Sequence, residues 1–300
     1  MSNASTIELR SRLERLEEMP TIPVVLAPLL RYLEQPLDTL EVQQVVDLIS
    51  QDKSLAAQCL HMANSPLYGR WQSIDSIRSA VVALGLHRMR DIAVSCSLLK
   101  LSPKGNTKLD PMVFWEHSLG CALVCRQFAR RIGFADPGKA YLGGLLHDIG
   151  VLAELAVLPN EFQDVFEIAS SNGTPLHEAE MNLFGLTHCD AGKIVAERWH
   201  LSDDLIAVLS CHHNPENAHT NRDFVALVSL SDLLCRMGGL GYGYLEERQV
   251  SFTDLPGFSL LLKECPPLQA FDWARFTFEL EAYMEEVHRL VDVLYHGSHE

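Results

Sequence analysis

The sequence predicts an all-α protein made of an N-terminal helical subdomain, a helical core and a helical extension. Apolar residues recur at helical spacing along nearly the whole chain. No stretch shows the alternation of apolar and polar residues, or the turn signals, that indicate a β-hairpin. A polar segment rich in turn-forming residues, 102–107, separates two helical regions. We therefore expect the subdomain over residues 1–105, the core over 106–240 and the extension over 241–300.

The N-terminal subdomain is expected to contain six short amphipathic helices. The first covers residues 6–18 and is ended by Pro20, which lacks the backbone N–H that a helix interior needs. Asn64-Ser65-Pro66 and Leu84-Gly85-Leu86 indicate two further helix ends. The remaining five helices are predicted at residues 24–33, 39–49, 54–63, 74–84 and 88–101.

The predicted core begins near Pro111 and ends at the glycine-rich segment 238–243, where the backbone can turn sharply. The extension contains a loop around Pro266-Pro267 and a long final helix over residues 272–295. The chain shows no internal repeat and no low-complexity tract, so a solenoid or a disordered linker is not expected.

The composition is that of a globular protein with an acidic surface. Hydrophobic residues make up 47 % of the 300 residues and charged residues 21 %. The formal net charge of −15 opposes non-specific binding to phosphate backbones, because such binding depends on clustered Lys and Arg. Nucleic acid is therefore not an expected partner.

The sequence also favours a cytoplasmic location without a membrane partner. No apolar run approaches the roughly 20 residues needed to span a bilayer. The segment Met1–Glu18 is charged and periodic, unlike a signal peptide. The eight cysteines form no C-x-x-C pair, which indicates buried thiols in a reducing compartment and gives no support to a thiolate zinc site.

Several histidines and two aspartates are predicted to point into the helical core. His117, for example, heads an apolar stripe of Cys121, Val124 and Phe128 on its helix. The inward set is His117, His147, Asp148, His188, His212, His213 and Asp232. The remaining histidines that we assign to ordinary surface or capping positions are His61, His87, His177, His200 and His219.

The inward set predicts a metal site, although each member alone is more simply a satisfied core residue. An inward carboxylate such as Asp232 is costly to bury without a partner. Imidazole and carboxylate together suit iron, manganese or zinc, and one carboxylate can bridge two ions. Asp148 is the natural bridge, since its neighbour His147 can bind one of the ions. We expect one or two divalent ions at this set.

The residues around His147 resemble the HD superfamily of metal-dependent phosphohydrolases. His117, then Leu146-His147-Asp148-Ile149-Gly150, then Asp232 look like its H…HD…D signature. Residues 49–69 and 79–85 resemble the N-terminal half of the HDOD family, the HD-related output domain. The resemblance covers about residues 19–238. It implies an HD-superfamily helical core with an N-terminal helical subdomain, and a role in bacterial signal transduction more often than a demonstrated catalytic one.

Residue by residue, the inward set also resembles the two-metal ligand set of the HD-GYP cyclic-di-GMP phosphodiesterases. The sequence departs from these enzymes in two places. Val151 stands where they carry a Lys that helps to hold substrate phosphate, and Asn214-Pro215-Glu216 follows the histidine pair without the Gly-Tyr-Pro motif downstream. Gly241-Tyr242-Gly243 lies beyond Asp232 and is not its equivalent. The metal ligands are thus kept while part of the substrate-binding set is missing.

Three hypotheses follow. The first is a non-catalytic regulatory module that acts on a signalling protein whose identity the sequence does not give. The second is a metal-dependent phosphohydrolase of a nucleotide or cyclic dinucleotide, in which Asp148 would be catalytic. The third is a sensor that binds a ligand, such as a nucleotide, in the former active-site cleft without cleaving it. Val151 favours the first, because it offers neither charge nor donor to a phosphate, and we expect little or no phosphodiesterase activity.

Overall fold

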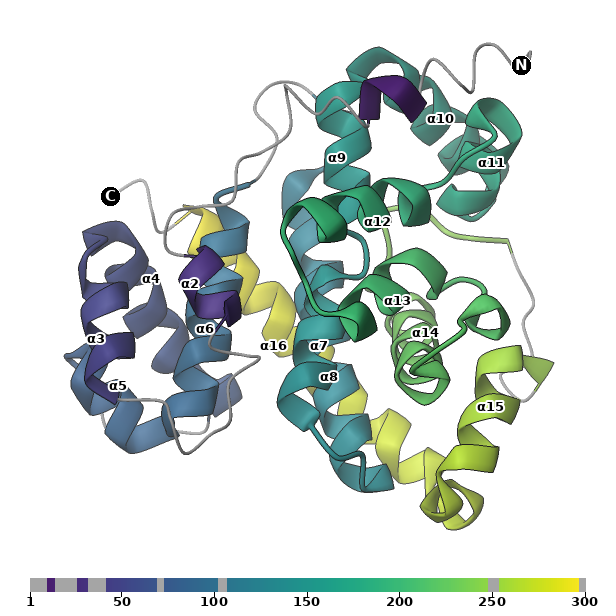
Figure 1. Cartoon of the computed structure of the whole chain (residues 1–300). Helices are drawn as coiled ribbons and strands as arrows, with labels where there is room; N and C mark the ends of the chain where they lie inside the picture. Colours follow the sequence, from purple (N-terminus) through teal and green to yellow (C-terminus); the bar gives the residue numbers. More distant parts are fainter. Residues whose placement is uncertain are drawn as a thin grey trace. The chain divides into compact units, whose positions relative to one another are not determined.

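The computed structural model describes residues 10–13, 26–31, 42–68, 73–101, 107–247 and 254–296, and every regular element among them is helical (Figure 1). The predicted all-α class is confirmed. Of the first predicted helix only residues 10–13 are described, and they are helical. Pro20 and most of the turn-rich segment 102–107 lie outside the described residues.

The chain divides into two compact units. The first consists of the described residues of Met1–Thr21 and Pro103–Arg275, and the second consists of those of Ile22–Ser102 and Phe276–Glu300. From Phe276 onward, the last helix therefore groups with the N-terminal helices, whereas the sequence assigned it to a separate extension. The domain boundaries at residues 105 and 240 stay predictions.

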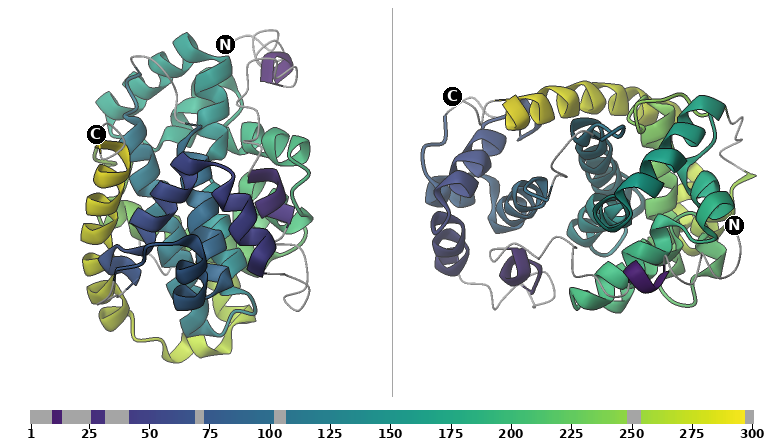
Figure 2. Two further views of the ribbon diagram at one scale, coloured as in Figure 1. Left: turned by 90° about the vertical axis from the view of Figure 1, so that its left-hand side faces the viewer. Right: turned by 90° about the horizontal axis from the view of Figure 1, so that it is seen from above.

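The second unit is a bundle of short helices (Figure 2). Within it, α6 contacts α2, α4 and α5. Gly85, with φ +87°, separates α5 from α6, as the sequence predicted, because this backbone angle favours glycine. The helices are α2 (Leu26–Arg31), α3 (Val42–Ser50), α4 (Lys53–Ala63), η2 (Pro66–Tyr68), α5 (Ile77–Leu84) and α6 (Leu86–Leu99), followed after the first unit by most of α16 (Trp273–His296).

The first unit contains the residues of the predicted core. Its long helix α7 packs against α8 and α14, and α12 packs against α9 and α13. The helices are α7 (Pro111–Ile132), α8 (Pro137–Leu146), α9 (Ile149–Val157), α10 (Pro159–Asn172), α11 (Leu176–Phe184), α12 (His188–Arg198), α13 (Asp203–Cys211), η3 (Pro215–Asn217), α14 (Arg222–Met237), α15 (Pro256–Glu264) and η5 (Pro266–Ala270).

Two glycines allow these helices to approach closely. A Cβ atom at Gly144 would lie 2.6 Å from the carbonyl oxygen of Cys121, so α8 needs a glycine where it crosses α7. A Cβ atom at Gly150 would lie 1.9 Å from the carbonyl oxygen of His188, so α9 and α12 meet backbone to backbone. The sequence between these two glycines is thereby held close to both α7 and α12.

One stretch corrects the expectation about apolar runs. Residues Pro137–Val157 are long and apolar enough to cross a membrane by length and composition, but 94 % of the most apolar window is buried within the structure. The stretch comprises α8 and α9, with the turn at His147 and Asp148 between them. A buried pair of core helices passes the same test, so the finding is weak evidence for a membrane span.

Candidate metal centre

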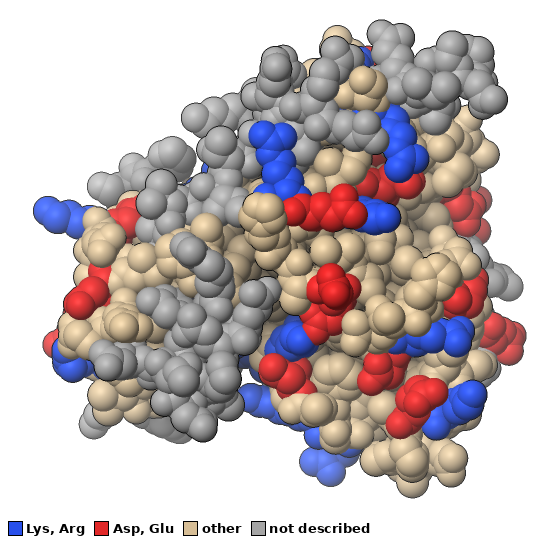
Figure 3. Space-filling model, in the orientation of Figure 1, with Lys and Arg blue, Asp and Glu red and all other residues tan. Residues whose placement is uncertain are grey.

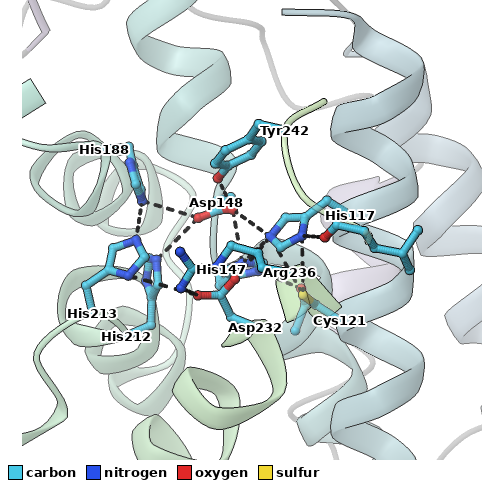
Figure 4. Close-up of polar contacts among 12 residues, drawn as sticks. His117, Cys121, His147, Asp148, His188, His212, His213, Asp232, Arg236 and Tyr242 are labelled. Atoms are coloured by element: carbon cyan, nitrogen blue, oxygen red, sulfur yellow. Dashed lines mark hydrogen bonds and ion pairs between the residues drawn. The ribbon is translucent and has the colours of Figure 1, made fainter. Parts of the chain in front are cut away.

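The predicted inward set converges on one point in the first unit (Figure 4). Six of its seven residues are at most 2 % exposed, and the side chain of the seventh, His213, is 10 % exposed. The set comes from five places: His117 on α7, His147 and Asp148 between α8 and α9, His188 at the start of α12, His212 and His213 after α13, and Asp232 on α14. The convergence is present as predicted, while the role of these residues as metal ligands stays a prediction.

Asp148 lies at the centre because of the turn that carries it. It is the N-cap residue of α9, but its side chain makes no capping hydrogen bond, so its carboxylate is available to the histidines. The close approaches at Gly144 and Gly150 bring α7 and α12 to either side of this turn. The glycines thus position the two groups of ligands described next.

The first group surrounds one carboxylate oxygen of Asp148. Asp148 Oδ2 lies 3.2 Å from His117 Nε2 and 3.0 Å from His147 Nε2. Asp232 Oδ1 lies 3.3 Å from His117 Nε2, and the two Nε2 atoms are 3.2 Å apart. Four ligand atoms arranged around a cation at about 2.0–2.2 Å would be separated by about 3.3–3.6 Å, which is close to these distances.

The second group surrounds the other oxygen. Asp148 Oδ1 lies 3.3 Å from His188 Nε2 and 3.2 Å from His212 Nε2. His213 Nε2 completes this group at 3.0 Å from His188 Nε2. Asp148 Oδ1 is buried and has no hydrogen-bond partner of good geometry. One carboxylate therefore joins two groups of imidazoles, which is the arrangement expected of a bridging ligand.

The histidine tautomers support a cation at this place. The Nδ1 atoms of His117, His147 and His212 lie 2.7, 2.8 and 3.1 Å from the carbonyl oxygens of Leu240, Gly144 and Val208. Since a carbonyl only accepts, each Nδ1 carries a hydrogen, and in the neutral ring each Nε2 therefore presents a lone pair. Lone pairs that face each other across about 3 Å repel unless a cation or a proton lies between them. The donor set therefore fits a divalent cation.

The pKa shifts of His117 and Asp148 also indicate that positive charge is favoured at this place. Burial opposes the imidazolium form, yet hydrogen bonds to Asp148 and Asp232 raise the pKa of His117 to about 10. Burial likewise opposes ionisation of Asp148, but His147 and His117 lower its pKa well below the usual range. Without a cation, protons would have to balance the buried carboxylates.

Three further residues contact the set and were not predicted. Glu180 of α11 accepts hydrogen bonds from His188 Nδ1 and from the His188 backbone N–H, both at 2.8 Å. Arg236 donates to Asp232 Oδ2 at 2.8 Å and pairs with Glu246 at 2.9 Å. The Tyr242 hydroxyl donates to Asp148 Oδ2. Only Arg236 had a sequence signal, since it follows Asp232 by one helical turn.

The assignment of His177 to an ordinary position is wrong. Its ring stacks on that of His213 with the centroids 3.9 Å apart, and it is half-buried. The exclusion of cysteine from the site also needs qualification, because the thiols of Cys121 and Cys189 lie 3.7 Å from nitrogens of His117 and His212. The other histidines set aside, His61, His87, His200 and His219, are exposed as predicted.

Comparison with known proteins gives one family and several similar structures. The family model of the HDOD domain matches residues 19–215. A crystal structure of an HDOD domain protein of unknown function from Geobacter sulfurreducens is 29 % identical, with a TM-score of 0.84 over 97 % of this chain and 98 % of that one. A candidate phosphohydrolase from Shewanella amazonensis SB2B is 21 % identical, with a TM-score of 0.71 over 95 % of this chain and 98 % of that one, which shows a shared fold.

One curated relative is an uncharacterised protein of Treponema pallidum (strain Nichols). It is 24 % identical over 261 residues, which are 86 % of this chain but 50 % of that protein. The chain thus spans half the length of this relative. These relatives show the fold of the chain but do not establish an activity for the buried centre.

Proposed function

This chain belongs to the HDOD family, and we propose that it is a cytoplasmic regulatory module of bacterial signal transduction that acts by binding a protein or a ligand. In this proposal the converging histidines and aspartates hold one or two divalent cations, and the centre does not turn over phosphodiesters. The donor set supports iron, manganese or zinc without distinguishing among them.

The observation that carries the proposal is the burial of the Asp148 carboxylate beneath other parts of the protein. Asp148 is 1 % exposed, and its Oδ2 atom accepts a hydrogen bond from Tyr242. A two-metal phosphoryl transfer needs substrate oxygens and an attacking oxygen to reach the ions on either side of the bridge. Protein atoms occupy the approach to Asp148 instead, which supports a binding role over a catalytic one.

The charges around the centre support the same conclusion. Val151 is fully buried and has no donor to offer a phosphate. Arg236 is the cation nearest in sequence to Asp232, but its guanidinium is paired with Asp232 and Glu246. Loss of one electrostatic contact to the transition state typically costs about 100- to 1000-fold in rate. Val151 and the paired Arg236 therefore provide little stabilisation for the charge that develops on a transferred phosphoryl group.

A bound cation would neutralise the buried carboxylates and cross-link the helices that carry its ligands. The residues that would hold it are His117, His147 and Asp232 on one side of Asp148, and His188, His212 and His213 on the other. Glu180 would fix the ring of His188 through its Nδ1 atom.

The alternative is a metal-dependent phosphohydrolase of a nucleotide or cyclic dinucleotide. It is favoured by the completeness of the two ligand groups around Asp148, which a purely structural cation would not require. In this alternative Asp148 would be the catalytic bridge between the ions. The two hypotheses differ in whether a phosphodiester that reaches Asp148 is turned over.

The test is an assay of cyclic-di-GMP, other nucleotides and a generic phosphodiester, in manganese and in iron under reducing conditions. We expect turnover no higher than that of Asp148→Ala. Robust turnover that disappears in Asp148→Ala would replace the regulatory hypothesis by the phosphohydrolase. In the host cell, the signalling phenotype should survive Asp148→Ala but be lost when an exposed surface residue such as Val82, which is 81 % exposed, is changed to Glu.

A further inference from the structure

The segment after α14, residues 238–247, contacts the centre through its inner side. We call this segment the cap. The carbonyl oxygen of Leu240 accepts the hydrogen bond from His117 Nδ1, and the hydroxyl of Tyr242 donates to Asp148 Oδ2. The ring centroids of Tyr242 and His117 are 5.2 Å apart, and Figure 4 shows the two side chains beside Asp148. One short segment thus contacts both the bridging carboxylate and an imidazole of the first ligand group.

The far end of the cap is fixed to the turn between α10 and α11. The backbone N–H of Glu247 donates to the carbonyl oxygen of Gly173 at 2.7 Å, and the Tyr244 hydroxyl donates to the carbonyl oxygen of Thr174 at 2.9 Å. A Cβ atom at Gly173 would lie 2.8 Å from Glu247 Cγ, so this approach depends on the glycine. These contacts hold the closed position at a place well separated in sequence from the ligands.

The cap itself has few of the interactions that stabilise a helix. It contains no regular element, and Gly239 and Gly243 have φ angles of +91° and +84°. A cavity of about 610 Å³ lies between the cap and α14, with Arg236, Met237 and Tyr244 among its lining residues. The cap is held by two buried side chains, Leu240 and Tyr242, and by a few polar contacts, while its other residues are partly or fully exposed. Such a segment detaches at a lower free energy than the helices around it.

Together these contacts point to a gate, and we propose that Tyr242 is the residue that determines access to the centre. With the cap closed, the Tyr242 hydroxyl donates its hydrogen bond to Asp148 Oδ2. Anionic ligands are then excluded from the centre, and bound cations exchange slowly. With the cap detached, Asp148 and His117 become accessible to solvent and to ligands. This inference rests on the proposed cation centre and adds the residue that controls it.

The test measures how fast a bound cation leaves the full-length protein. The protein is loaded with cobalt(II), whose visible absorption reports occupancy, and release into excess chelator is followed by stopped flow. Tyr242→Phe removes only the hydroxyl that contacts Asp148. We expect release to be about 10- to 100-fold faster, as for the loss of one hydrogen bond to a charged group. Tyr244→Phe, which loosens the far end of the cap without contacting Asp148, should accelerate release as well.

A matched control is Tyr283→Phe, the same chemical change on α16 in the second unit. Its release rate should equal that of the unchanged protein. If Tyr242→Phe does not fold, as judged by circular dichroism, Tyr244→Phe carries the test. Normal cobalt uptake with unchanged release in both cap variants, or equal acceleration in Tyr283→Phe, would overturn the gate while the centre stands. A protein that takes up no cobalt at all would overturn the centre and the gate together.

Discussion

The two oxygens of Asp148 are not interchangeable, because each faces a different group of imidazoles. Oδ2 lies 3.0 Å from His147 Nε2, and Oδ1 lies 3.2 Å from His212 Nε2. A change at this one residue should therefore affect both groups at once. The bridging role makes Asp148 the most informative position at which to test whether a cation binds here.

Asp148→Asn is expected to weaken the binding of a divalent cation by more than about 100-fold. Changes to groups that only orient a ligand already cost about 10- to 100-fold, and this change removes the shared charge itself. Isothermal titration with manganese or zinc measures the affinity. Asp164→Asn, on the exposed side of α10, is the control and should leave the affinity unchanged. Equal affinities in the two variants would place the cation elsewhere.

A second residue-scale prediction concerns Glu154 of α9, which is fully buried and whose carboxyl oxygens have no hydrogen-bond partner. Burial and the nearby carboxyl of Glu180 raise the pKa of Glu154 well above its ordinary value of 4.5. The folded state therefore binds the proton more tightly than the unfolded state. The free energy of unfolding should fall as the pH rises above about 4.5, until the folded protein also loses the proton.

Glu154→Gln removes this titration and keeps the shape of the side chain. Its free energy of unfolding should exceed that of the unchanged protein by a margin that grows from pH 4.5 toward neutrality. Urea unfolding at a series of pH values measures this margin. A constant difference across the series would show that Glu154 is ionised in the folded state.

At the same scale, the seven converging residues were selected by the helical phase of the sequence together with the resemblance to a two-metal ligand set. Tyr242 could not be found in this way. It reaches Asp148 across 94 residues of sequence from a segment without periodicity. His177 escaped notice because its partner, His213, follows another helix, and a stacking contact leaves no pattern along the chain.

At the scale of elements, the contact between α9 and α12 decides whether His188 reaches Asp148. Gly150→Ala should destabilise the protein by about 1–3 kcal/mol or more, because its Cβ atom would meet the backbone of His188, which cannot move aside cheaply. Urea denaturation measures the loss. Gly257→Ala in α15 is the matched control, since its Cβ atom would meet its nearest neighbours at 3.5 Å or more. A neutral Gly150→Ala would mean that α12 can shift.

The helix positions themselves were largely predictable. The final helix was expected at residues 272–295 and is found at Trp273–His296, and α4 was expected at 54–63 and is found at Lys53–Ala63. The predicted and observed helix ends agree best where the sequence contains a recognisable N-cap residue. One example is Asp52, whose side chain accepts a hydrogen bond from the backbone N–H of Leu55. Of the helix expected at 39–49, residues 39–41 lie outside the described residues, and the part that is described is helical from Val42.

At the scale of the whole molecule, charges of both signs are visible on one face, and the expectation that nucleic acid is not a partner stays a prediction. On the face shown in Figure 3, the Lys and Arg side chains of the described residues are interspersed with Asp and Glu. A duplex-binding surface would gather basic side chains along one track. The sequence could not, however, predict that the last helix groups with the N-terminal unit. The apolar stripe of α16 shows that it packs, but the pattern does not identify what it packs against.

Because every predicted ligand belongs to the first unit, a cation should stabilise that unit selectively. Hydrogen exchange followed by mass spectrometry should show slower exchange in peptides from α7, α9, α12 and α14 when manganese or zinc is added. Peptides from residues 42–68, in the second unit, should exchange at the same rate with and without the metal. Equal slowing in both units would show that the two unfold together, and no slowing in either would argue against the centre.

The grouping of α16 with α2–α6 also has a consequence for the order in which the protein forms on the ribosome. The N-terminal helices emerge first but cannot complete their unit until residues 276–296 have been translated. The intervening unit, which contains all the predicted ligands, is available to fold earlier. Apolar surface on the early helices is therefore expected to stay exposed during synthesis of more than half the chain.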